Sequence, residues 1–376
     1  MALTALRLNR ATLARQLLLR RERIPVVEAV RRVVAVQAQD AASVHLALWN
    51  RVADLDPAEI DAAFADHALV KASLMRITLH AVEATDYPAF QHAMVSSLRA
   101  SRLNDRRFTD TGLTAGDADA LLPDVLAFTA EPRTNAQVEA WLHERLGTPQ
   151  PRVWWALRTF APVVHAPTGP PWSHGPRPAY VTSRTTPATG DPGPSVQRLV
   201  RRYLEGFGPA TPQDIGQFSI LRMPVVRAAL GAMGGTVERL EGPDGVELYD
   251  VPGGLRPPES TAAPPRLLGM WDSTLLAYAD RGRIVPPDHR SVIFRRNGDV
   301  LPTLLVDGYV AGVWRPVDGG IEATAFRDLP AKAWKGLAAE AKGLEGFLAG
   351  RDRYLYRRQA NWWDSMPAAD VRLLPG

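Results

Sequence analysis

The sequence predicts an α+β chain of three tandem winged-helix units followed by an antiparallel β-rich domain. Two observations carry this prediction. Helical patterns recur in groups, and a short run of β-forming residues follows each group, which is the order of elements in a winged helix. After about residue 259, β-forming runs alternate with Asn-Gly and Asp-Gly turn signals. The expected boundaries are 1–95, 96–192, 193–258 and 259–376.

The first unit, residues 1–95, joins helical patterns to a β-ribbon. Its stretch Val26–Val34 places valines at i, i+4, i+7 and i+8, the apolar stripe of a helix. Continuing this stripe by three residues leads to Gln37, within "VVAVQAQDAA". Farther along, "LVKASLMRITLHAVEA" is rich in β-forming residues, so we expect it to close the unit.

The second and third units follow the same plan. Thr134 or Asn135 is placed to cap one helix, and the Pro/Gly-rich "PTGPPWSHGPRP" is a candidate wing tip. In the third unit Thr211 caps a helix that begins with Pro212. A hairpin around Asp244-Gly245 ends that unit. Such units bind DNA or serve only as protein-interaction scaffolds, and the sequence leaves both readings open.

The C-terminal region is expected to form a meander with hairpins at Asn297-Gly298 and Asp307-Gly308. Arg295 and Arg296 stand beside the first turn, where they would meet backbone phosphates or enter a groove. The alternative is an ordinary solubilising turn. The stretch "AKAWKGLAAEAKGLEGFLAGRDRYL" predicts a last helix that packs across the sheet.

Composition excludes several classes of chemistry. The chain has 376 residues, is 46% hydrophobic and contains no cysteine. Disulfides, thiolate nucleophiles and cysteine-bound metal centres are therefore excluded. We find no signal peptide and no apolar run of membrane-spanning length, so we expect a cytoplasmic protein with no membrane partner.

Basic residues suggest a phosphate-binding surface. The formal net charge is +4, and arginines gather in four stretches, at residues 99–107, 198–202, 281–296 and 351–358. Any one stretch could be a solvated face, but four in one chain favour a nucleic-acid partner.

The search for catalytic motifs is mostly negative. The chain has no phosphate-binding glycine loop, no H-E-x-x-H motif and no G-x-S-x-G motif. Its eight histidines are scattered, so we expect no metal and no cofactor. Lys71 is the one candidate for a Schiff base, although a wing position near phosphate or solvent suits it better.

The remaining candidates are Gln37 and Gln39. If the helix continued, the two side chains would point about 200° apart. If the chain is extended after about Val36, they fall on one side and face one space. Asp40 would then cap the next helix. Two amides could hold a water molecule against a reacting carbon, or Gln37 could satisfy buried backbone groups while Gln39 is solvated.

The stretches "RVVAVQAQDAASVHLALWNRV", "LVKASLMRITLHAVEATDYPAF", "LLGMWDSTLLAYADRGRI" and "LLVDGYVAGVWR" resemble the bacterial AlkZ-type DNA glycosylases over nearly the whole chain. The Gln-x-Gln signature is the specific part, since relatives outside this branch carry Gln-x-Asp. The resemblance implies a C-shaped arrangement of the units and excision of N7-alkylated purines, including bulky adducts and interstrand crosslinks, as self-resistance to a DNA-alkylating natural product. Trp271 departs from the family, which more often has Phe before Asp272.

The resemblance also implies roles for residues. Gln37 and Gln39 become the catalytic pair of a monofunctional hydrolase without a lyase step, acting as a monomer on double-stranded DNA with alkylated purines. The expected DNA-binding residues are Arg76, His80, His289, Arg290, Arg295 and Arg296. Arg76 and His80 either face DNA or bind the turn that carries Gln37.

Two other functions compete with this one. A winged-helix transcriptional regulator without catalysis would explain the basic residues, but it gives no reason for the glutamine pair and is usually a small symmetric dimer. A protein that sequesters a reactive metabolite would need an apolar pocket rather than an arginine-lined cleft.

Overall fold

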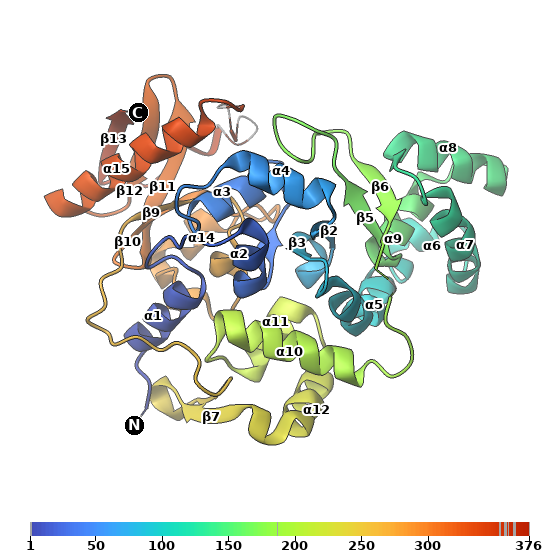
Figure 1. The fold of residues 1–376 in the computed structure, drawn as a ribbon, viewed down its shortest axis with the longest axis horizontal. Coiled ribbons are helices and arrows are strands. Elements are labelled where there is room, and N and C mark those ends of the chain that lie inside the picture. The colour runs from blue at the N-terminus through green and yellow to red at the C-terminus, as the bar shows by residue number, and fades with distance from the viewer. Residues whose placement is uncertain are drawn as a thin grey trace.

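Three groups of helices and short strands precede a five-stranded sheet in the computed structural model (Figure 1). The structure describes residues 2–185, 187–352, 355–356, 359, 361–363 and 366–375. The first group lies at the centre, between the C-terminal sheet and the second group, with the third group below it (Figure 1). The mixed helix and strand composition predicted from the sequence is confirmed, whereas the winged-helix character of each unit stays a prediction.

The first group forms a three-stranded antiparallel sheet in the order β1-β3-β2. Its elements are α1 (Ala5–Arg15), α2 (Val26–Val33), β1 (Val36–Gln37), α3 (Ser43–Trp49), α4 (Pro57–Ala65), β2 (Leu69–Ser73), η1 (Met75–Ile77) and β3 (Leu79–Glu83). Gln37 of β1 stands opposite His80 of β3, which in turn stands opposite Ala72 of β2. These three residues therefore share one face of the sheet.

Helix α2 stops before the glutamine pair because the chain turns sharply at Val34. Val34 has φ 74° and ψ −53°, and the Ala35 N–H donates to the Val33 carbonyl at 2.9 Å. This is the geometry of a strained γ-turn, and a β-branched residue makes it costlier. The apolar stripe thus ends at Val34, and Gln37 lies in an extended chain.

The second group forms a sheet in the order β4-β6-β5. Its elements are α5 (Tyr87–Leu103), α6 (Arg106–Thr109), α7 (Ala115–Phe128), β4 (Arg133–Thr134), α8 (Asn135–Leu146), α9 (Pro151–Phe160), β5 (Val163–Ala166) and β6 (Ala179–Thr182). Of the two predicted caps, Thr134 is the one that caps α8, through a capping box with Gln137.

The loop between β5 and β6, the candidate wing tip, is packed against the first group. Trp172, Ser173 and His174 in this loop are buried. The ring of His174 packs edge-on against Phe64 of α4, with centroids 4.6 Å apart, and the Ser173 hydroxyl donates to Asp61 at 2.6 Å. The loop is docked on the first group because its aromatic and imidazole rings find apolar partners there.

The third group agrees closely with the sequence expectation. Its elements are α10 (Gly193–Phe207), α11 (Pro212–Ser219), α12 (Met223–Met233), η2 (Gly234–Thr236), β7 (Glu238–Glu241), η3 (Pro243–Gly245) and β8 (Glu247–Asp250). Thr211 caps α11, and Pro212 is its first residue. Asp244 and Gly245 turn the β7–β8 hairpin with φ 56° and 75°.

The C-terminal region contains an antiparallel sheet in the order β13-β12-β11-β10-β9. Its elements are β9 (Arg266–Leu268), α13 (Ser273–Leu276), η4 (Arg281–Arg283), η5 (Pro287–His289), α14 (Arg290–Ile293), β10 (Thr303–Val306), β11 (Tyr309–Val317), β12 (Gly320–Ala325), α15 (Ala331–Leu348) and β13 (Asp370–Pro375). Helix α15 packs on this sheet through a cluster that includes Trp334 and Trp314, as predicted.

Of the two hairpins predicted in this region, only one is regular. Asp307 and Gly308, with φ 50° and 80°, join β10 to β11. The turn at Asn297-Gly298 is instead closed by a single bridge between Phe294 and Val300, and the residues before it form α14 rather than a strand.

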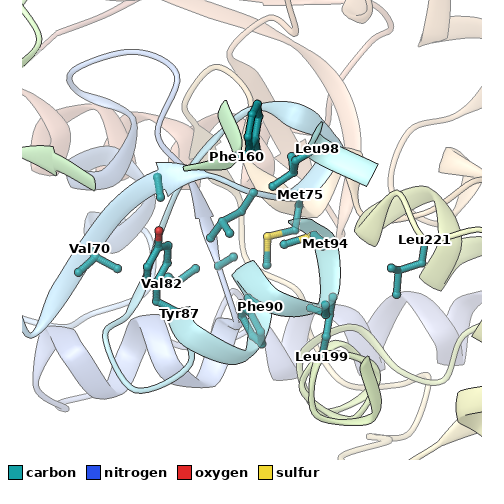
Figure 2. Packing of buried hydrophobic residues seen from close by; sticks show 14 of the residues in the cluster. Val70, Met75, Val82, Tyr87, Phe90, Met94, Leu98, Phe160, Leu199 and Leu221 are labelled. Atoms are coloured by element: carbon teal, nitrogen blue, oxygen red, sulfur yellow. The ribbon is translucent and has the colours of Figure 1, made fainter. Parts of the chain in front are cut away.

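One apolar cluster unites the three groups. It contains Val70 and Val82 of the first sheet, Phe90 and Met94 of α5, and Leu199 of α10 (Figure 2). The face of the first sheet that carries Gln37 is therefore packed against the rest of the molecule. No helix among the described residues has the length and apolar character needed to cross a bilayer.

Candidate active site at the glutamine strand

The two glutamines leave strand β1 in different environments. Gln37 is 3% exposed, whereas Gln39, just beyond the strand, is exposed. The Oε1 atom of Gln39 accepts the Leu79 backbone N–H at 3.4 Å. The strand ends at Gln37, and Gln39 lies in the bend that follows it.

The backbone of Gln37 is held from the C-terminal region. Its N–H donates to Ser273 Oγ at 3.1 Å, and the Ser273 hydroxyl donates to the Ala35 carbonyl at 3.0 Å. The neighbouring Asp272 caps α13 and forms a buried bidentate ion pair with Arg51 at 2.8 and 2.9 Å. Asp272 thus fixes the start of α13, whose Ser273 holds the backbone of β1.

The side chain of Gln37 is held by Arg76, which lies in the turn between β2 and β3. Nη2 of Arg76 donates to Gln37 Oε1 and lies 3.3 Å from His80 Nε2. Nδ1 of His80 lies 3.2 Å from the Thr78 carbonyl. Since that carbonyl only accepts, Nδ1 carries the proton and Nε2 accepts from Arg76. Burial and the charge of Arg76 lower the pKa of His80 well below 6.5, consistent with a neutral ring.

Arg76 is a cation without an anion. Among the described residues it forms no ion pair, and its Nη1 is sealed from solvent with no hydrogen-bond partner. The guanidinium carbon lies 5.6 Å from the ring centre of Phe218. Burial, and then the charge of Arg281, lower the pKa of Arg76 to about 10, so it stays charged at neutral pH.

Asp40 and Lys71 depart from expectation. Asp40 does not cap α3 as its N-cap, which is Ala42; its carboxylate instead accepts the Ala42 N–H at 3.0 Å. Lys71 is not at a wing surface, because it is buried in β2, on the opposite face from Gln37 and His80. Burial lowers the pKa of Lys71 to about 8, although Asp40 acts in the opposite direction.

The predicted DNA-binding residues separate into two sets. Arg296 is exposed beside the Asn297-Gly298 turn, and Arg295 is half-buried with its guanidinium 5.5 Å from the ring of Trp362. Arg290 is paired with Asp280, and His289 Nδ1 lies 3.3 Å from the Val310 carbonyl. The second set is half-buried Arg76, which contacts the Gln37 side chain, and His80, which is 0% exposed and contacts Arg76.

Of the four arginine stretches, those at 99–107 and 198–202 are largely engaged in protein contacts. Arg99 and Arg107 pair with Asp119 and Asp105, and Arg198 and Arg202 both grip Asp86. In the last stretch Arg351 pairs with Asp61, while Arg353, Arg357 and Arg358 lie outside the described residues. The stretch at 281–296 is engaged in part, since Arg290 pairs with Asp280 and Arg283 donates to the Pro209 carbonyl, whereas Arg296 is exposed.

The sequence did not single out Ser273, Arg51 or Phe218, all of which surround Gln37 or its supports. An Asp272-Ser273 pair before a short apolar helix is a cap signal, but its partners lie more than 200 positions away. The described residues offer no group of three or more histidines and carboxylates that could bind a metal. A cavity of about 530 Å³ is lined by Trp49, Phe347 and Arg351, among others, and does not include either glutamine.

Comparison with known proteins gives concordant results. The chain matches the model of the family described as DNA glycosylase AlkZ-like over residues 30–347. A relative from Streptomyces sahachiroi, described as an interstrand DNA cross-link repair glycosylase, is 27% identical over 361 residues, covering 88% of this chain and 94% of the relative. The solved structure of the Streptomyces sahachiroi DNA glycosylase AlkZ shares the fold, with a TM-score of 0.79 at 23% identity over 94% of this chain and 99% of that one.

Proposed function

Because the chain belongs to the AlkZ-like family of DNA glycosylases and is therefore a DNA repair glycosylase, we propose that it hydrolyses the N-glycosidic bond of N7-alkylated purines in double-stranded DNA. Gln37 and Gln39 are its catalytic pair. The observation that supports the proposal is that the strained turn at Val34 ends the helix before Gln37, whose backbone and side chain are both held in place.

The chemistry suits amides instead of a carboxylate. Alkylation at N7 places positive charge on the purine, so the base leaves readily and an oxocarbenium-like sugar develops at C1′. The oxygens of Gln37 and Gln39 each accept one hydrogen bond within the protein, and each retains a second lone pair. Those lone pairs can orient a water molecule toward C1′ and stabilise the positive charge on the sugar.

Hydrolysis without a lyase step fits the position of Lys71. A Schiff base at C1′ requires an amine that can reach the sugar. Lys71 is 6% exposed and starts from the opposite face of the sheet from Gln37. Although its lowered pKa would make it nucleophilic, its burial keeps it from serving as that amine.

The DNA contacts are assigned to the region around 289–296. Arg296 is exposed, and Arg295, Arg290 and His289 lie beside it with partly exposed side chains. Guanidinium groups there would contact phosphates and bring the duplex to the glutamine strand. An open approach of this kind suits bulky adducts and crosslinks, which cannot be flipped freely into a tight pocket. The S. sahachiroi relative is described as a cross-link repair glycosylase. For this protein we further propose self-resistance to an alkylating natural product and action as a monomer.

The test is a duplex with one N7-methylguanine, incubated with the protein and divided before alkali treatment. We expect strand scission only in the alkali-treated half, because hydrolysis leaves an intact abasic site. Scission without alkali would refute the absence of a lyase step. Tight binding with no scission, also on a crosslinked duplex, would favour a DNA-binding regulator without catalysis.

A further inference from the structure

We propose that Arg76 is a positioning residue that fixes the orientation of the Gln37 amide, with His80 as its neutral support; this inference rests on the proposed function of Gln37. Both protons of Arg76 Nη2 are used, one on Gln37 Oε1 and one on His80 Nε2. Because a guanidinium only donates, Gln37 must turn its oxygen toward Arg76 and its NH2 group away. That NH2 group has no hydrogen-bond partner among the described residues.

The cost of this arrangement argues for a role outside stability. Arg76 is half-buried, has no carboxylate partner among the described residues and keeps Nη1 sealed without a hydrogen bond, and a charge or donor that is removed from water without a partner is unfavourable. Had the fold needed only to fill this position, an apolar side chain would serve it better.

The backbone adds a second, independent observation. Arg76 and Ile77 occupy the left-handed region with φ 54° and 61°, which is unfavourable for residues with a Cβ and most of all for a β-branched one. The preceding Met75 is 0% exposed and packs in the same cluster as Met94 and Leu98 (Figure 2). The turn is therefore anchored while strained, and the strain is stored where Arg76 meets Gln37.

The same geometry argues against other roles for Arg76. A positive charge does not favour a positively charged sugar, so its contribution lies in orienting Gln37. Phosphate binding is disfavoured because Nη1 is sealed and both protons of Nη2 are used, which leaves only Nε of the guanidinium as a donor. His80 must stay neutral, because a proton on Nε2 would face a guanidinium proton.

The first test uses Arg76→Met, with Arg158→Met as a matched control. Arg158 is also half-buried and without an ion pair among the described residues, and it donates to Asn135 and Tyr180 at 2.9 and 2.8 Å. For Arg76→Met we expect single-turnover base release to slow by roughly 10- to 100-fold. Its Kd for the duplex should not change, and its Tm should be equal to or above that of the wild type. Arg158→Met should keep the rate. Arg76→Lys should not restore it, since an ammonium lacks the planar fork.

Two outcomes would overturn the proposal. An unchanged rate in Arg76→Met would remove any role in catalysis. A weaker Kd with a shallower salt dependence would make Arg76 a DNA contact.

A readout independent of activity separates this proposal from the glycosylase assignment. The side-chain amide resonances of Gln37, identified by their loss in Gln37→Ala, should shift in Arg76→Met and stay in place in Arg158→Met. Unshifted resonances would refute the positioning role even if the enzyme is active. Shifted resonances with no base release from any substrate would uphold the contact and refute the proposed function instead.

Discussion

Two arginines lie close to strand β1, and they are held in opposite ways. Arg51 forms a bidentate pair with Asp272, and their side chains are 2% and 1% exposed. Arg76 meets an amide oxygen, an imidazole and an aromatic ring, and no carboxylate of the described residues pairs with it. The first arrangement neutralises its charge and fixes the segment that grips the strand. The second leaves the charge of Arg76 without a counter-charge among the described residues, and we infer that this arrangement orients the Gln37 amide.

This difference suggests a rule for the buried charges of this protein. Where a buried charge has a matched partner, its removal should damage the fold. Where a buried charge lacks one, its removal should leave the fold unharmed or stabilise it.

The largest effect is expected for the paired region. Asp272→Ala leaves Arg51 buried without its partner, which should lower the free energy of unfolding by about 3–5 kcal/mol. The double variant Arg51→Met with Asp272→Leu should recover much of this loss, because no unpaired charge remains. Urea unfolding measures the free energy of unfolding of both variants. An Asp272→Ala variant as stable as the wild type would show that the Arg51–Asp272 pair does not stabilise the fold.

Removal of the Lys71 charge should stabilise the fold instead, because Lys71 has no ion-pair partner among the described residues. Its pKa is about 8 in the folded protein and 10.5 when exposed, so the unfolded chain binds more protons between these pH values. Stability should therefore rise with pH across that window. Lys71→Met should add about 3 kcal/mol at pH 7 and abolish its share of the rise. Destabilisation by this substitution at pH 7 would show that the ammonium has a partner.

Buried histidines differ from buried arginines and lysines because a histidine side chain can be neutral at physiological pH. Burial, with Lys71 as the next cause, lowers the pKa of His174 from 6.5 to about 3. The unfolded chain thus binds more protons between pH 3 and 6.5, and stability falls as pH drops below 6.5. The share of His174 is about 1.4 kcal/mol per pH unit well inside that window. In urea melts from pH 6.5 to 4.5, His174→Phe should lose less stability than the wild type; equal losses would contradict the assignment.

The smallest effect concerns surface arginines. Arg296 is exposed and unpaired among the described residues, whereas the exposed Arg106 pairs with Asp110 at 3.4 Å. Arg296→Ala should weaken duplex binding and reduce the slope of log K against log salt by about 0.9, the share of one phosphate contact. Arg106→Ala serves as the control and should leave the slope unchanged. An unaltered slope for Arg296→Ala would place the DNA elsewhere.

Features set by neighbouring residues could be predicted from the sequence, whereas most contacts between distant segments could not. The cap at Thr211, the turn at Asp307-Gly308 and the closing helix depend on neighbouring residues, and the structure has them. The strand expected before the Asn297-Gly298 turn is instead helix α14, because tertiary packing overrides local preference. The glutamine pair was singled out from the apolar stripe that leads to Gln37, and its catalytic role came from the resemblance to a family. The contact of Arg76 with Gln37 was one of two roles that the resemblance left open, whereas Ser273 lies 236 positions from Gln37, beyond the reach of any local pattern.

The most direct test of the account measures release of the free N7-methylguanine base from a saturated duplex, for the wild type, Gln37→Ala and Gln39→Ala. We predict that both variants bind the duplex as the wild type does and release base far more slowly. Release at the wild-type rate by both variants would contradict the catalytic role of Gln37 and Gln39, because the chemistry would then lie outside the glutamine strand.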